Sequence, residues 1–65
     1  MSHYYCYLLD DEGKVKAREV MESADDRDAV RKARNYLLAH PLIPAVEVWL
    51  AERRVDLLIQ LRPVA

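Results

Sequence analysis

Residues 45–61, AVEVWLAERRVDLLIQL, form two apolar runs separated by a short charged segment. Strict alternation of apolar and polar side chains over four to eight residues is typical of a half-buried strand. A charged pair between two such runs is typical of a tight turn. The stretch therefore predicts two antiparallel strands joined at Glu52 and Arg53.

The position of this turn fixes which side chains share a face, because side chains alternate along a strand. With Glu52 and Arg53 at the tip, one face carries Val46, Val48, Leu50, Val55, Leu57 and Ile59. The opposite face carries Glu47, Trp49, Asp56, Leu58 and Gln60. In this register Trp49 and Leu58 are diagonal neighbours on the face expected to be the wetter one. The only tryptophan of the chain should therefore lie on the solvent side of a sheet.

Two further strands are expected in the first third of the chain. Tyr4 to Leu9 is rich in aromatic residues, which favour strands. Gly13 follows in an acidic segment and should adopt the left-handed conformation that closes a short hairpin loop. Val15 to Met21 alternates and is expected to form the second strand of this hairpin.

A single helix is expected between the two hairpins. Ser23 should cap its first turn, with Asp26 at the reciprocal position of a capping box. Apolar residues then recur at helical spacing, at Ala29, Val30, Ala33 and Leu37. The helix should end near Ala39, because Pro41 disfavours helical geometry at the preceding residue. We expect the link residues Leu42 and Ile43 to tuck under the edge of the sheet.

The order ββαββ predicts one α+β domain over residues 1–65. We expect two layers: a four-stranded antiparallel sheet of order 2-1-3-4, with the helix on one face only. The first strand has two apolar faces, one with Tyr4, Cys6 and Leu8 and the other with Tyr5, Tyr7 and Leu9. Which of them packs on the helix is left open.

The uncovered face predicts self-association. A chain of 65 residues with one cysteine cannot form an internal disulfide, and domains of this size usually need a disulfide, a metal or a partner. An apolar patch on one sheet face would also match or exceed what monomers usually expose. We expect a homodimer whose interface contains Tyr5, Tyr7, Leu9, Trp49, Leu58, Lys16, Arg18, Glu47 and Asp56.

Two alternatives to the homodimer remain. In one, the chain is a monomer whose Trp49 and tyrosines are shielded by the Leu42–Ile43 link or by the C-terminal tail. In the other, the face captures a different protein or a small ligand. A second surface that a partner could use is the helical flank formed by Arg27, Arg31 and Arg34.

No catalytic, cofactor or metal site is expected, so the chain is predicted not to be an enzyme. One glycine excludes a glycine-rich phosphate loop. His3 and Cys6 are an odd number of positions apart, so they should lie on opposite faces of their strand. The acidic pairs Asp10–Asp11 and Asp25–Asp26 suit a turn and a helix start. His40, just after the helix, suits a structural role at its negative end.

Charge and hydropathy narrow the class of partner. Ten basic residues against eleven acidic ones give a net charge of −1, so nucleic acid is not an expected partner. No apolar run approaches the ~20 residues that span a bilayer. A lone thiol fits a reducing interior, so we expect a cytoplasmic protein.

The segments YYCYLLDDEG, ADDRDAVRKARNYLLA and VEVWLAERRV together resemble a known pattern. The chain resembles short bacterial ββαββ proteins of an uncharacterised domain-of-unknown-function family, which implies a fold and no activity. Its first two-thirds are also similar to the HicB-type antitoxin fold, although the Pro-Asp-Leu-Pro-Gly segment and the appended DNA-binding part of that group are missing.

Three functions follow from these expectations. The first is a non-enzymatic association domain that homodimerises through its open sheet face. The second is a partner-binding regulator, such as an antitoxin-like subunit, that uses this face or the arginine flank. The third is a small-molecule or enzyme site built across a dimer interface, with His3 or the tyrosines as polar groups.

Overall fold

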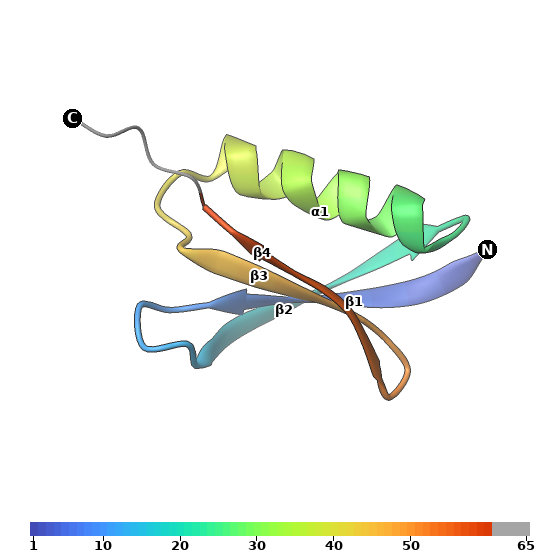
Figure 1. The fold of residues 1–65 in the computed structure, drawn as a ribbon, viewed down its shortest axis with the longest axis horizontal. Coiled ribbons are helices and arrows are strands. Elements are labelled where there is room, and N and C mark those ends of the chain that lie inside the picture. The colour runs from blue at the N-terminus through green and yellow to red at the C-terminus, as the bar shows by residue number, and fades with distance from the viewer. Residues whose placement is uncertain (61–65) are drawn as a thin grey trace.

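Residues 1–60 fold into one antiparallel sheet with a single helix across one of its sides (Figure 1). The computed structural model describes residues 1–60, so Leu61, expected at the end of the last strand, lies outside them. The elements are β1 (Ser2–Leu9), β2 (Val15–Ser23), α1 (Asp26–Ala39), β3 (Ala45–Leu50) and β4 (Arg53–Ile59). The strand order β2-β1-β3-β4 confirms the predicted α+β topology.

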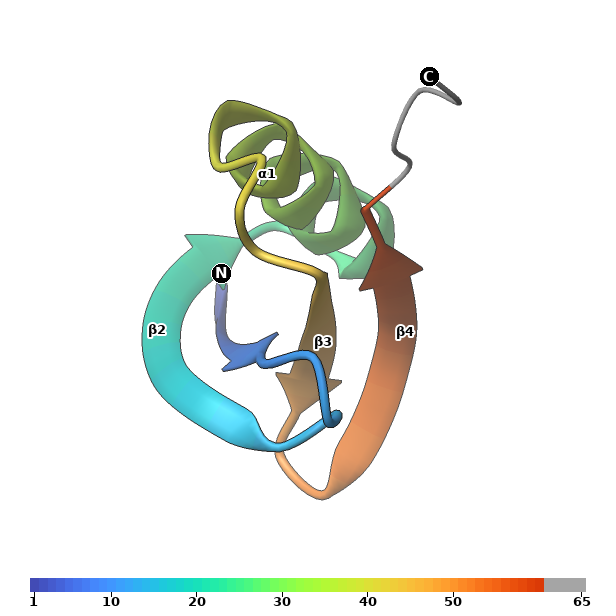
Figure 2. The same ribbon diagram turned by 90° about the vertical axis from the view of Figure 1, so that its left-hand side faces the viewer.

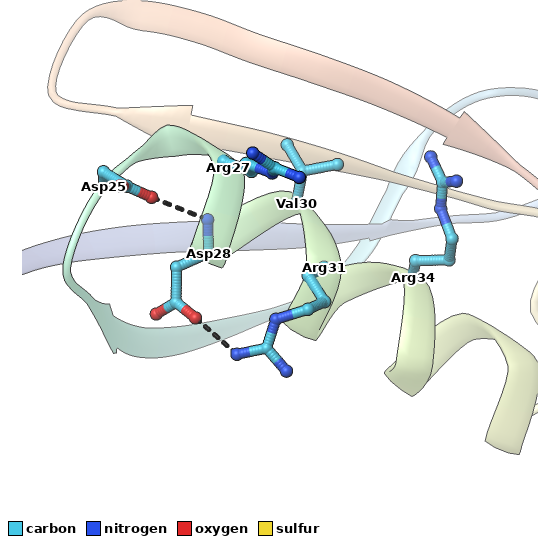
Figure 3. Close-up of a pocket in the computed structure, with 6 residues that line it drawn as sticks. All are labelled: Asp25, Arg27, Asp28, Val30, Arg31 and Arg34. Atoms are coloured by element: carbon cyan, nitrogen blue, oxygen red, sulfur yellow. Dashed lines mark hydrogen bonds and ion pairs between the residues drawn. The ribbon is translucent and has the colours of Figure 1, made fainter.

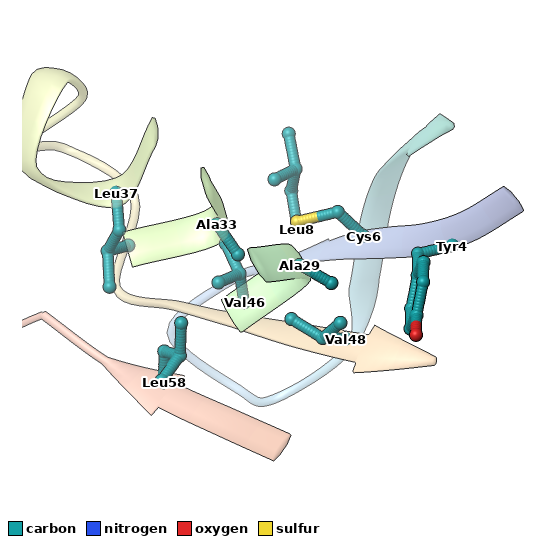
Figure 4. Packing of buried hydrophobic residues seen from close by; sticks show 9 residues of the cluster. All are labelled: Tyr4, Cys6, Leu8, Ala29, Ala33, Leu37, Val46, Val48 and Leu58. Atoms are coloured by element: carbon teal, nitrogen blue, oxygen red, sulfur yellow. The ribbon is translucent and has the colours of Figure 1, made fainter. Parts of the chain in front are cut away.

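The helix and the sheet enclose a small apolar core (Figure 4). Ala29 and Ala33 of α1 are 0% and 1% exposed. Because an alanine side chain is a single methyl group, the helix can approach the strands closely at these positions. The cluster consists of Tyr4, Cys6, Leu8, Ala29, Ala33, Leu37, Val46, Val48 and Leu58. Figure 2 shows that α1 lies on one side of the twisted sheet and that no element among residues 1–60 lies on the other.

This core determines which face of β1 the helix covers. Tyr4, Cys6 and Leu8 pack beneath α1. Tyr5 and Tyr7 alternate with them and therefore lie on the side of the sheet without a helix.

The predicted register of the C-terminal hairpin is wrong by one residue. Val46 pairs with Leu58 and not with Ile59, and Val48 pairs with Asp56. Leu58 is consequently buried under α1, 7% exposed, whereas Ile59 is 64% exposed. Leu57, expected in the core, is 39% exposed.

The error has two causes in the backbone of the hairpin. The loop residues are Ala51 and Glu52, since Leu50 pairs with Arg53. Ala51 has a φ of 54°, a left-handed conformation usually marked by Gly, Asn or Asp, so no residue type indicated the tip. This loop shifts the pairing by two positions, and a bulge next to Trp49 shifts it back by one, so the residues of β4 after the bulge change faces.

The helix start also differs from expectation. Asp25 is the N-cap, and its carboxylate accepts a hydrogen bond from the backbone N–H of Asp28 at 2.8 Å. Asp28 in turn accepts from the N–H of Ala24 at 3.3 Å. Ser23 caps nothing: it ends β2, fully buried, and its hydroxyl has no partner among the described residues. Asp26 does not close a capping box, because its carboxylate contacts Tyr4 of β1 and Arg53 of β4.

Two adjacent residues of the link between α1 and β3 differ in burial. Leu42, expected to tuck under the sheet, is 90% exposed, whereas Ile43 packs against the core cluster. Gln60, expected on the open face, lies at the helix C-terminus. Its side-chain amide donates to the carbonyl of Leu37 at 2.8 Å and to that of His40 at 3.2 Å.

The observed register makes opposite demands on neighbouring residues of β4. Replacing Leu58 by Ala should lower the free energy of unfolding by about 2 to 5 kcal/mol, because the side chain fills the core. Replacing Ile59 by Ala should change it by about 0.5 kcal/mol or less, because that side chain is exposed. Urea unfolding followed by circular dichroism measures both changes. The reverse order of sensitivities would show that Ile59 occupies the core.

Candidate association surface

Three aromatic side chains cluster on the side of the sheet opposite α1. Tyr5 and Tyr7 come from β1, and Trp49 pairs with Tyr5 from the neighbouring strand β3. The ring centroids of Tyr7 and Trp49 lie 6.4 Å apart at an interplanar angle of 89°, an edge-to-face contact. Those of Tyr5 and Tyr7 lie 6.5 Å apart at 29°. All three side chains are partly exposed, so the rings form a preorganised apolar centre.

Charged groups of both signs surround this centre. The guanidinium carbon of Arg18 lies 5.2 Å from the centroid of the Tyr5 ring, a cation–π distance. On the other flank, Arg54 Nη1 lies 3.2 Å from Glu47 Oε2. We call the surface formed by Tyr5, Tyr7, Arg18, Val20, Glu47, Trp49 and Arg54 the open face.

Five of the nine expected interface residues lie on the open face. They are Tyr5, Tyr7, Arg18, Glu47 and Trp49. Val20, which pairs with Tyr5 and is 54% exposed, and Arg54, which pairs with Trp49, were not expected there. The signal for Val20 was its position two residues after Arg18 on the same strand.

The other four expected residues are buried or lie away from the aromatic rings. Leu58 is in the core, and Asp56 pairs with the fully buried Val48, which puts it on the helix side of β4. Leu9 is only 8% exposed. Lys16 is the unpaired residue of a bulge opposite Leu8 and Leu9. It lines a hollow with these leucines and residues 42–44, away from the aromatic rings.

The link between α1 and β3 does not shield the open face. Leu42 extends into solvent, and Ile43 faces the helix-side core. The surroundings of Trp49 are instead Tyr7, Val15, Glu47 and Ala51, which line one shallow hollow. Among residues 1–60, the aromatic centre therefore has no cover.

The arginine flank of α1 is divided into two parts (Figure 3). Arg31 points to Asp28 and forms an ion pair with it, while Lys32 Nζ lies 3.2 Å from the other carboxylate oxygen. Arg27 and Arg34 extend away from Asp28. No carboxylate within the described part of the chain forms an ion pair with either of them.

A polar contact that sequence reasoning missed joins three elements at the start of the helix. Tyr4 donates its hydroxyl to Asp26 Oδ1 at 2.8 Å, and Arg53 Nη2 lies 3.1 Å from Asp26 Oδ2. The hydrogen bond from Tyr4 lowers the pKa of Asp26, and the same bond raises the pKa of Tyr4. No short-range pattern could reveal this contact, because its members are 22 and 27 residues apart.

The groups considered for catalysis lie apart from one another. Cys6 is 4% exposed, and burial raises the pKa of its thiol to about 11, which suppresses the reactive thiolate. His3 Nε2 lies 3.0 Å from Glu22 Oε1 at the sheet edge. His40 stacks on Tyr36 at 4.1 Å at the end of the helix. Asp10 accepts hydrogen bonds from two backbone N–H groups of its own turn.

Two kinds of feature are absent from residues 1–60: a cluster of metal-binding side chains and a helix that could span a membrane. No group of three or more His, Cys, Asp or Glu side chains there is arranged to hold a metal ion. No helix in this range has the length and apolar character needed to cross a bilayer.

Comparisons with known proteins found no matching family model, curated protein or solved structure. The function of this chain must therefore be inferred from the surfaces described above.

Acid should weaken the helix start in a defined range. Hydrogen bonds from Arg31 and from the Ala24 N–H lower the pKa of Asp28 from 3.8 to about 2. A carboxyl group whose folded-state pKa is lowered adds stability that is present above its unfolded pKa and is lost as pH falls through the folded value. Asp28→Asn should therefore lower the melting temperature at pH 5, and its difference from wild type should shrink as the pH falls and be small at pH 2. Asp11→Asn, in an exposed loop, is the control; an Asp28→Asn difference that persists unchanged at pH 2 would contradict this assignment.

Proposed function

We propose that this chain is a non-enzymatic association domain that pairs with a second copy through its open face. The observation that carries the proposal is the cluster of Tyr5, Tyr7 and Trp49, which no element among residues 1–60 covers. Burial of aromatic side chains is among the largest contributions to association, and Tyr and Trp are enriched at interface centres.

The charges around the cluster favour a copy of the same chain. A twofold interface must be complementary to itself, so its rim needs groups of both signs. Arg18 lies on one flank of the rings and Glu47 with its partner Arg54 on the other. An arginine of one copy can therefore meet the carboxylate of the other. The same balance weighs against single-stranded nucleic acid, which needs a positive groove beside its stacking residues.

The size of the face indicates weak association. Four strands about 4.8 Å apart and about six residues long cover on the order of 400 Å² of flat sheet. Even with the relief of side chains, this corresponds to the smaller class of specific interfaces. We therefore expect the dimer to dissociate when the protein is diluted to micromolar concentrations.

The proposed compartment rests on the thiol of Cys6, and the proposed lack of enzymatic activity rests on the positions of the titratable groups. Cys6 is a single, buried cysteine, which fits a reducing compartment such as the cytoplasm. The titratable groups are spread over separate turns and edges, which supports binding over catalysis as the role of the domain.

A second candidate function follows from the arginine flank. Arg27 and Arg34 have no described ion-pair partner and project from the same side of α1. An acidic segment of a different protein is the partner they suit, as expected for an antitoxin-like regulator. If this candidate is right, a different protein that binds the wild type should fail to bind the double variant Arg27→Ala, Arg34→Ala. The open face is unchanged in that variant.

Fluorescence of Trp49 reports directly on the open face, because it is the only tryptophan. As the protein concentration rises from about 1 µM to about 200 µM, the range of weak association, its emission should shift to the blue. Quenching by acrylamide should fall in parallel, because the second copy excludes water from the indole.

A matched pair of variants at Tyr7 is the control. Tyr7→Phe keeps an aromatic ring beside Trp49 and should preserve the shift, whereas Tyr7→Lys introduces a charge and should abolish it. Circular dichroism verifies that both variants remain folded. Emission of the wild type that does not depend on concentration would refute pairing through the open face.

A further inference from the structure

The two edges of the sheet differ in how their outward peptide groups are satisfied. In an antiparallel strand at an edge, alternate residues direct their N–H and C=O groups away from the neighbouring strand. On β4 the backbone N–H of Leu57 donates to Asp56 Oδ1 at 2.8 Å. A side chain of the same strand thus occupies the middle of that edge.

The edge formed by β2 carries no such side chain at its centre. Lys32 Nζ donates to the carbonyl oxygen of Glu22 at 2.7 Å, so this carbonyl points away from β1. By alternation, the peptide groups of Arg18 and Val20 point the same way. Outside the ladder with β1, no described residue forms a hydrogen bond with either of them. The lysine uses one lone pair of the Glu22 carbonyl and leaves the second.

We propose that β2 pairs with β2 of a second copy, antiparallel and centred on Val20. This contact is made by the backbone of the β2 edge and shares the side chains of Arg18 and Val20 with the open face, but it does not depend on the proposed function. A twofold axis perpendicular to the sheet joins the two edges, keeps both helices on one side and builds an eight-stranded sheet.

Charge favours one register among those the axis allows, because only centring on Val20 pairs opposite charges without also pairing like charges. Centring on Arg18 would place two arginines opposite each other, and centring on Glu19 would do the same with two glutamates, which is unfavourable. Centring on Val20 places Val20 opposite its own copy and Arg18 opposite Glu22. All three of these side chains lie on the same side of β2, since they pair with Tyr7, Tyr5 and His3 of β1. The contact therefore has two symmetric ion pairs around an exposed valine pair.

Edge pairing would also enlarge the open face. Val20 pairs with Tyr5 in its own chain, so the valine pair would lie between the aromatic clusters of two copies. Its twofold axis is perpendicular to any face-to-face axis. The two contacts are therefore compatible in a closed tetramer when their axes intersect.

Disulfide trapping tests the register. In the chain with Cys6→Ala, a Val20→Cys substitution brings two thiols to opposite positions, with Cα atoms about 5.5 Å apart. This distance lies within the range of disulfides, so oxidised glutathione should produce a covalent dimer. Arg18→Cys in the same background is the matched control, because its two copies would be about 13 Å apart. This variant should remain monomeric on a gel run without reductant.

If the Cys6→Ala chain does not fold, the same pair of variants can retain Cys6, because that thiol is buried. Equal trapping at positions 18 and 20, or none at position 20, would overturn the proposal.

Charge exchange tests the ion pairs, with the rate of Val20→Cys trapping as the readout. Arg18→Glu and Glu22→Arg should each slow trapping about tenfold, because each places like charges opposite one another twice. The double exchange should restore the rate. Lys16→Glu, which changes the charge equally but falls outside the ladder, should have little effect. Failure of the double exchange to restore trapping would refute this register.

The edge and the open face fail in distinguishable ways. Tyr7→Lys should leave Val20→Cys trapping intact while it abolishes the shift in Trp49 emission. Arg18→Glu should slow trapping, whatever the state of the open face. Loss of trapping in the Tyr7→Lys variant would mean that the edge contact is a consequence of face pairing, and would overturn its independence.

Discussion

A four-stranded sheet has two faces, and helix α1 covers one of them (Figure 2). The core beneath α1 contains Ala29 and Ala33 of the helix together with larger side chains of the sheet. β1 is apolar on both of its faces, so the packing that orders Tyr4, Cys6 and Leu8 necessarily leaves Tyr5 and Tyr7 outside. The character of the uncovered side thus follows from how the covered side is built.

Local patterns were sufficient for the topology because they act over short distances. The left-handed Gly13, with a φ of 80°, closes the first hairpin as expected. The apolar stripe of α1 and the proline after it marked the helix within a few residues of its observed ends. These signals depend on neighbours in sequence, and they placed all five elements in the right order.

The register of the second hairpin and the helix cap depended on features that residue types did not reveal. Ala51 adopts a conformation for which alanine gives no warning, and one bulge moved Leu58 from the solvent side to the core. At the helix start, three acidic residues and a serine compete for one capping position. Asp25 occupies it because β2 continues as far as Ser23 and buries that hydroxyl. The aromatic part of the candidate site was predictable because Trp49 and the tyrosines precede the bulge, whereas Asp56 and Leu58 follow it.

The open face and the β2 edge meet where Val20 pairs with Tyr5. Both proposed contact surfaces therefore lie on one side of the molecule. The opposite edge is occupied by the Asp56 side chain at its middle, and the arginine flank is partly neutralised by Asp28. The proposed self-association through the open face would combine an aromatic centre with rim charges of both signs, the two features that suit a twofold contact.

The most direct test of pairing through the open face is an isotope-filtered NMR experiment on an equimolar mixture of labelled and unlabelled chain at high concentration. Pairing through the open face predicts intermolecular nuclear Overhauser effects from the Trp49 indole to tyrosine rings of the other copy. Their absence, in a sample whose translational diffusion corresponds to a monomer, would contradict the account.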